Sequence, residues 1–132
     1  MKSILWILCL AAPVAAQEPQ LTGVAACNRA LELVEKGRAT EAVTLLEGAR
    51  SSIGESDLWL WWGNLGFAQR ELRKDLPALE ALGKSVELKP DGWFGYYYAQ
   101  LLHEYGRWDE AMKVLDGPIP ASMADRAESL KA

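Results

Sequence analysis

Apolar and small residues recur along most of the chain with the spacing of a helix face. In no segment do apolar and polar residues alternate as they do in a half-buried strand. The pattern predicts helices over residues 21–36, 40–52, 58–72, 76–88, 92–105 and 108–116, and a last short helix over about 122–130. The sequence therefore predicts an all-α fold.

A set of small residues recurs three times with the same spacing. The copies contain Ala30, Gly37, Ala42, Leu46 and Ala49, then Gly66, Arg73, Ala78, Leu82 and Ser85, then Ala99, Gly106, Ala111, Leu115 and Pro118. A small residue lets two helices approach closely, and a glycine seven positions later can end the first helix in a left-handed turn. Each copy is expected to form a helical hairpin, with Arg73 where the other turns have glycine.

Residues typical of helix ends agree with these boundaries. Asp57, Asp75 and Asp91 can each cap the helix that follows, because a carboxylate accepts hydrogen bonds from the free amides of the first turn. Pro90 is expected to stop the fourth helix. Residues 122–125, Ser-Met-Ala-Asp, resemble a capping box that opens the last helix.

The middle copy resembles the tetratricopeptide repeat (TPR) family. The residues that carry the resemblance are Trp62, Leu65, Gly66, Ala78, Leu82 and Pro90. Gln69 departs from the family at the usual aromatic, and Arg73 departs at the turn glycine. The resemblance implies a right-handed α-solenoid of about three hairpins, with repeats over about 23–56, 59–91 and 92–118, closed by the short helix as a cap.

Members of this family generally bind a peptide or a partner's helix in a concave groove lined by the first helices of the hairpins. Carried over by the alignment, the groove positions of the first hairpin are Val24, Cys27, Leu31, Val34 and Glu35. In the later hairpins the resemblance and the neighbouring aromatics indicate Leu60, Phe67, Arg70, Glu71, Trp93, Tyr96, Tyr97, Gln100 and His103 as groove residues. The implied partner is a protein or a peptide.

Aromatic residues are concentrated in WLWW at 59–62 and WFGYYY at 93–98. Consecutive helical positions point to all sides, so some of these rings must face outward. We expect Trp62, Tyr98 and Trp108 to pack in the core. The rings at 93, 96 and 97 fit both the groove and the core, and Tyr and Trp are frequent at binding hot spots.

The first 16 residues have the pattern of a cleavable signal peptide, with Lys2 before an apolar run from Ile4 to Ala12. A retained anchor is the alternative. Cleavage after Ala16 would leave residues 17–132 as one TPR domain in the periplasm or outside the cell, and would change the formal charge from −4 to −5. No cluster of Lys and Arg is present, which argues against nucleic-acid binding. Cys27 would be the one remaining cysteine, either a quiet half-buried thiol or a link to another chain.

No recognisable catalytic, metal-binding or nucleotide-binding motif occurs in the sequence, so we expect neither an enzyme nor a cofactor. The leading hypothesis is an adaptor or assembly factor of the cell envelope that binds a protein partner. One alternative is a structural subunit that associates with itself, as in a homodimer. A third hypothesis is a small exported enzyme that acts through His103.

Overall fold

The protein's structure, a computed structural model, describes residues 21–132, so the predicted signal peptide lies outside the described residues. The helices are α1 (Gly23–Glu35), α2 (Ala39–Ala49), α3 (Leu58–Glu71), α4 (Asp75–Leu88), α5 (Phe94–Glu104), α6 (Trp108–Asp116) and α7 (Ala124–Lys131). Short 3-10 helices are η3 (Arg50–Ser52), η4 (Glu55–Asp57) and η5 (Ala121–Met123). The predicted all-α fold is confirmed for this part of the chain, which contains no strand.

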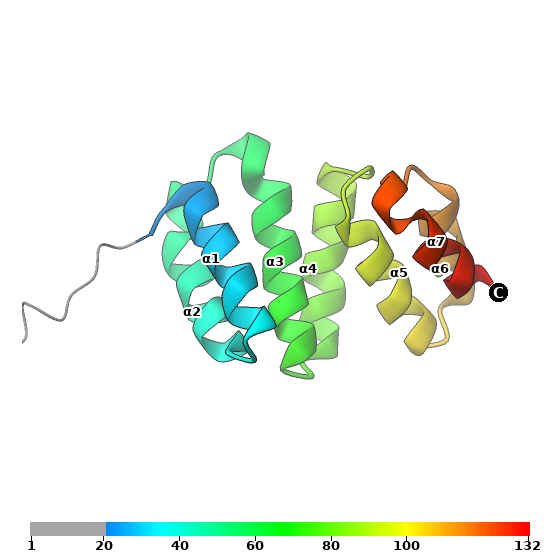
Figure 1. Cartoon of the computed structure of the whole chain (residues 1–132), viewed down its shortest axis with the longest axis horizontal. Coiled ribbons are helices and arrows are strands. Elements are labelled where there is room, and N and C mark those ends of the chain that lie inside the picture. The colour runs from blue at the N-terminus through cyan, green and yellow to red at the C-terminus, as the bar shows by residue number, and fades with distance from the viewer. Residues whose placement is uncertain (1–20) are drawn as a thin grey trace, which may run out of the picture.

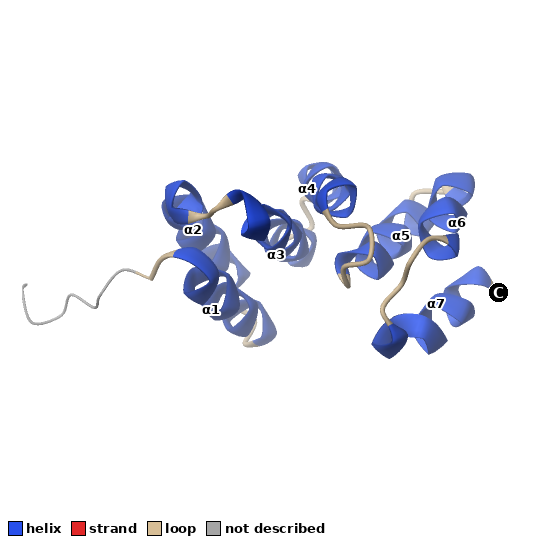
Figure 2. Ribbon diagram, turned by 90° about the horizontal axis from the view of Figure 1, so that it is seen from above, coloured by secondary structure: helices blue, strands red, loops and turns tan. Residues whose placement is uncertain are grey.

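The helices form a row along the long axis of the molecule, with α1 and α2 at one end, then α3, α4 and α5, and α6 and α7 at the other end (Figure 1). Helices α1 to α4 run alternately up and down. Helices that are adjacent in the sequence pack together, and α3 and α4 share the most extensive contact. Seen from above, α2, α4 and α6 lie toward one side of the row and α1 and α7 toward the other, with α3 and α5 between them (Figure 2).

The same turn closes all three hairpins. Gly37, Arg73 and Gly106 all have positive φ angles, of 77°, 60° and 73°. At the first turn, the Gly37 amide donates to the Val34 carbonyl and the next amide donates to the Leu33 carbonyl, at 2.9 and 2.7 Å. The other two turns repeat this pair of hydrogen bonds, which is the Schellman end of a helix. The repeated spacing in the sequence thus corresponds to a repeated turn.

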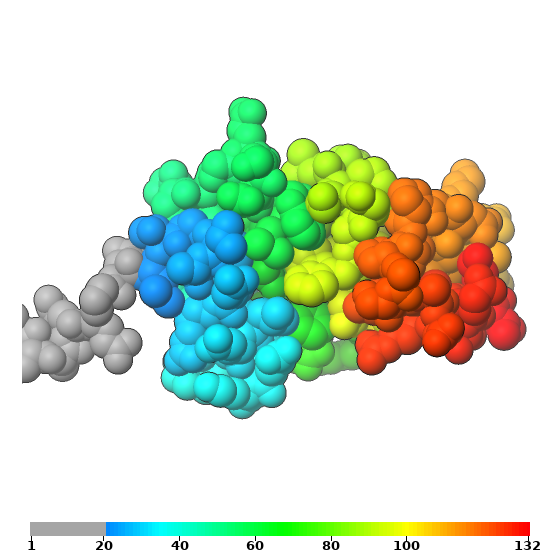
Figure 3. Space-filling model, turned by 45° about the horizontal axis from the view of Figure 1, so that its top comes forward, coloured from blue at the N-terminus to red at the C-terminus, as the bar shows by residue number. Residues whose placement is uncertain are grey.

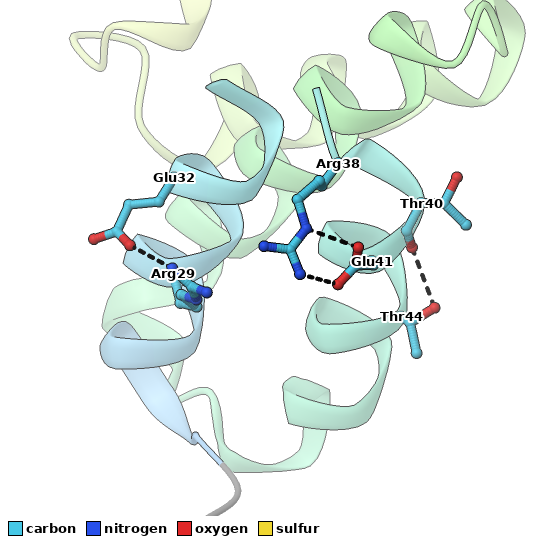
Figure 4. Close-up of polar contacts among 6 residues, drawn as sticks. All are labelled: Arg29, Glu32, Arg38, Thr40, Glu41 and Thr44. Carbon is cyan, nitrogen blue, oxygen red and sulfur yellow. Dashed lines mark hydrogen bonds and ion pairs between the residues drawn. The ribbon is translucent and has the colours of Figure 1, made fainter. Parts of the chain in front are cut away.

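The first and third turns are each followed by an equivalent ion pair between an arginine and a glutamate three residues later. Arg38 donates two hydrogen bonds to Glu41, at 2.8 and 2.6 Å (Figure 4), and Arg107 donates two to Glu110, at 3.1 and 2.5 Å. These hydrogen bonds hold the pKa of Glu41 and of Glu110 below the usual value of a glutamate. Both pairs are solvent-exposed, so they orient the turn more than they stabilise the fold.

Two hydrophobic clusters form the core. One joins α1, α2 and α3 around Leu46 and Trp61, and the other joins α4 to α7 around Leu82 and Leu102. Leu60 packs against both clusters and so connects them. The Trp61 indole donates a hydrogen bond of 2.7 Å to the Leu46 carbonyl, which satisfies its polar group inside the core.

Several sequence predictions are wrong in detail. Trp108 does not pack in the core, because 63% of its surface is exposed at the start of α6. Trp62 and Tyr98 are half-buried and pack against the two clusters, as predicted. The predicted caps do not form, since Asp57 makes no capping hydrogen bond, Asp75 lies within α4, and Trp93 precedes α5 in place of Asp91. The residues before α7 also lack a side-chain cap.

None of the helices in residues 21–132 combines the length and the apolar character that are needed to cross a membrane.

The strained turn at Arg73 yields a stability prediction. A non-glycine residue in the left-handed region costs about 1–2 kcal/mol, so Arg73→Gly is expected to raise the free energy of unfolding by about 1 kcal/mol in urea titrations. Gly37→Ala and Gly106→Ala are expected to lower it by about 1 kcal/mol. A Cβ at Gly37 or Gly106 would meet no atom within 4 Å, so that loss is conformational alone.

Arg73→Ala is the matched control, because it removes the exposed 3.6 Å contact with Asp75 and keeps the Cβ atom. This variant is expected to be no more stable than the wild type. Equal stabilisation by alanine and by glycine would show that the charge, and not the backbone conformation, destabilises the turn.

Candidate functional site

An open cleft of about 180 Å³ lies where the first helices of the three hairpins meet the segment before α7. Its lining residues are Leu31, Glu35, Phe67, Trp93, Phe94, Tyr97 and Met123. We call this the aromatic cleft. In Figure 3 the yellow surface of α5 lies between the cyan surface of α1 and the orange segment before α7. The aromatic cleft thus draws on α1, α3, α5 and η5.

Edge and tilted ring contacts hold the aromatic side chains in place. The rings of Phe67 and Tyr97 are 5.1 Å apart, which joins α3 to α5, and Tyr96 stands against Tyr97 at 5.4 Å. Trp93 meets Phe94 edge to face at 5.7 Å and remains 40% exposed. Such pairs favour one arrangement of the rings over others. The aromatic cleft is therefore built from mutually supported rings.

A glycine allows this arrangement to form. Phe94 is buried against α3, and a Cβ atom added to Gly63 would lie 2.1 Å from the Phe94 ring. No real side chain contact is that short, so only glycine admits the ring at this position. Gly63 therefore permits the close approach of α5 to α3, on which the contact of Phe67 with Tyr97 depends.

Only some of the residues that the sequence indicated for the groove line the aromatic cleft. Phe67, Trp93 and Tyr97 line the aromatic cleft, and Tyr96 lies beside it. Leu60 is half-buried between the core clusters, and Gln100 is half-buried on α5. The remaining predicted groove residues are Arg70, Glu71 and His103, which do not line the cleft.

Arg70 is engaged within the protein. Its guanidinium donates a 3.0 Å hydrogen bond to Glu104, and only 16% of the Arg70 side chain is exposed. The pair bridges the ends of α3 and α5. Because the two charges compensate each other, Arg70 is poorly placed to bind an acidic partner.

In the first hairpin, two of the five positions from the alignment, Leu31 and Glu35, line the aromatic cleft. Val24 is exposed outside its lining, and Cys27 and Val34 are buried in the first core cluster. Sequence reasoning missed Phe94 and Met123. Phe94 looks like any other ring in WFGYYY, and Met123 lies beyond the last repeat, so repeat spacing could not have found either residue.

His103 lies in a different cleft, of about 270 Å³, at the C-terminal end of the row. The other lining residues are Trp108, Ala111, Met112, Leu115, Leu130, Lys131 and Ala132. Two of its apolar residues, Trp108 and Met112, are exposed. Within residues 21–132, no three His, Cys, Asp or Glu side chains are grouped so that they could hold a metal ion.

Cys27 is fully buried in α1 and makes no disulfide with another described residue. Burial, assisted by the negative charge of Asp57, raises the pKa of its thiol from 9.0 to about 11. The thiolate is the reactive form of cysteine. A link from Cys27 to another chain would therefore require α1 to open first.

No protein-family model matches this chain, and neither a curated protein nor a solved structure is significantly similar to it.

The burial of Cys27 predicts slow modification of the folded protein. At pH 8 the thiol is expected to react with a thiol reagent such as Ellman's reagent many times more slowly in buffer than in urea, with Cys27→Ala as the blank. The unfolded thiol loses its proton near pH 9.0 and the folded one near 11. The free energy of unfolding should therefore fall as the pH rises from 9 to 11 in the wild type, and fall less in Cys27→Ala. Reaction at the unfolded rate in buffer would contradict this picture.

Proposed function

We propose that this protein is a TPR-like interaction module that binds a segment of a partner protein in the aromatic cleft. The observation that carries the proposal is the convergence of Phe67, Trp93 and Tyr97 on one open recess between several helices. Large aromatic side chains that are held in place and still partly exposed are the usual anchors of protein interfaces, because they offer contact area at little cost in entropy. The apolar segment near the N-terminus supports a role in the cell envelope, as an adaptor or assembly factor.

The repeated turn supports the TPR-like part of the proposal. Positive φ angles recur at residues 37, 73 and 106, in the register of the sequence repeat. Each turn is followed by a helix that packs on the one before it. A right-handed solenoid of about three hairpins, with α7 as a polar cap, accounts for both features.

The lining of the aromatic cleft favours binding over catalysis. Among the described residues that line it, Glu35 is the one carboxylate, and none is a histidine, cysteine or serine. An acid–base pair or an activated nucleophile needs a second group within hydrogen-bond reach. The apolar remainder suits side chains of an extended peptide or of an amphipathic helix.

Removal of one ring should weaken binding while the fold persists. We expect Trp93→Ala and Tyr97→Ala each to weaken partner binding at least tenfold, because truncation of an anchor leaves its contacts unfilled. The measurement is cross-linking in an extract of the native envelope, followed by titration of the captured partner. Leu76→Ala is the control, since Leu76 is 72% exposed on α4, away from the aromatic cleft. Capture that survives both cleft variants, with unchanged helicity, would contradict the proposal.

Self-association is a second candidate function, and the exposure of Trp108 favours it. Trp108 and Met112 line the C-terminal cleft with Leu130, so the end of the row presents an apolar surface.

If this surface pairs two copies, sedimentation velocity should show a dimer that dissociates on dilution. Trp108→Ser is expected to shift the population to the monomer, because it removes the largest apolar contact. Leu76→Ser, at another apolar position that is largely exposed, should leave the dimer intact. A protein that stays monomeric at every concentration would exclude this function.

A further inference from the structure

We propose that the aromatic cleft receives a basic side chain, lysine or arginine, of the partner segment. This inference rests on the proposed function and names the chemistry of the ligand at the same site. It arises from the combination of three partly exposed rings with one carboxylate in a single recess. Phe67, Trp93 and Tyr97 contribute the rings, and Glu35 is the one charged residue of the described lining.

The faces of aromatic rings attract cations. A ring carries partial negative charge on its face, so an ammonium or guanidinium group within about 6 Å of the ring centre is stabilised. The effect is strongest for tryptophan and increases when water is excluded. This protein already makes such contacts elsewhere, since the Lys84 ammonium lies 4.2 Å from the ring centre of Trp62 and the Lys89 ammonium lies 5.2 Å from that of Trp59.

No lysine or arginine from the described part of the chain lines the aromatic cleft. Arg70, on the neighbouring part of α3, is paired with Glu104 at 3.0 Å. Lys36 follows Glu35 in the chain but is not among the lining residues. The rings of the cleft thus differ from those of Trp59 and Trp62, which a lysine of the same chain already covers.

The first helices of the three hairpins each end at a glutamate, and the glutamate of α1 lines the aromatic cleft. Helices α1, α3 and α5 terminate at Glu35, Glu71 and Glu104. A carboxylate is unfavourable at a helix C-terminus, where the macrodipole is itself negative. Glu104 is compensated by Arg70, whereas Glu35 and Glu71 form no ion pair or side-chain hydrogen bond with any residue from 21 to 132. A basic side chain of the partner would supply the missing charge.

The size of the aromatic cleft limits what it can hold. Its volume of about 180 Å³ is below the roughly 300–1,000 Å³ of pockets that enclose a small molecule. It therefore suits roughly one or two side chains of a larger partner. Leu31 and Met123 in the lining favour an apolar residue next to the basic one, so the expected recognition element is a lysine or arginine beside an apolar side chain.

Selection from a random dodecapeptide display library on the immobilised protein tests this chemistry. We expect the selected peptides to be enriched in a lysine or arginine next to an apolar residue. In a synthetic copy of the best binder, replacement of the basic residue by norleucine, its uncharged analogue, should weaken binding about 5- to 30-fold. Glu35→Gln removes only the charge interaction at an exposed carboxylate, so it should cause a smaller loss for the basic peptide, about two- to fivefold, and none for the norleucine peptide.

Glu47→Gln is the matched control, because Glu47 is exposed on α2, outside the lining of the aromatic cleft. It should leave both affinities unchanged. The library could instead yield purely apolar peptides whose binding is lost in Trp93→Ala and kept in Glu35→Gln. That result would overturn the proposal that the cleft receives a basic side chain, and it would still support the proposed function. Absence of any enrichment, or binding that is indifferent to both Trp93→Ala and Tyr97→Ala, would overturn both.

Discussion

The close crossing of the two helices of each hairpin is the constraint on which the rest of this structure depends. At the middle crossing, a Cβ atom on Gly66 would lie 2.7 Å from the Leu82 side chain and 3.0 Å from the Leu82 amide nitrogen. In the outer hairpins the equivalent positions of the repeat are Ala30 and Ala42, and Ala99 and Ala111, all of them buried. Small residues let the helix backbones meet, so that contact along the whole hairpin becomes possible. Any larger side chain at these points would separate the helices and open both core clusters.

Because the crossings accept only small residues, the large rings of the chain are displaced to other positions. Trp61 lies in the first cluster, where its indole N–H donates a hydrogen bond to the Leu46 carbonyl. Trp59 and Trp62 are half-buried and lie under lysine side chains of α4 and its C-terminal end. The rings of α5 gather where Gly63 lets Phe94 settle on α3. The aromatic cleft thus forms because small side chains occupy the helix crossings and the large aromatic side chains lie nearer the surface.

The charged residues form ion pairs within helices and between helices, and a few carboxylates have no partner among the described residues. Most ion pairs join residues three or four positions apart, such as Arg29 with Glu32, and so belong to single helices. Arg70 with Glu104 is a tertiary pair that ties α3 to α5. Glu35 and Glu71, at the C-terminal ends of α1 and α3, form no ion pair with another described residue. A helix C-terminus carries partial negative charge, so these carboxylates are in an unfavourable position. The aromatic cleft therefore combines apolar contact area with an unbalanced negative charge.

The sequence by itself determined the helices and the turns between them. The predicted ends lie within three residues of the observed ones, and the spacing that aligned Gly37, Arg73 and Gly106 identified three equivalent turns. Helix periodicity and left-handed turns are local, so they are visible in short stretches of sequence.

Only the tertiary structure decided which residues form the cleft. The rotation of each helix about its axis put Cys27 and Val34 in the core, left Trp108 exposed, and selected Trp93 and Tyr97 from a run of aromatics. Met123 joined them because the chain folds back after α6. These outcomes depend on packing between segments far apart in the sequence, and the local pattern of apolar and polar residues does not specify that packing.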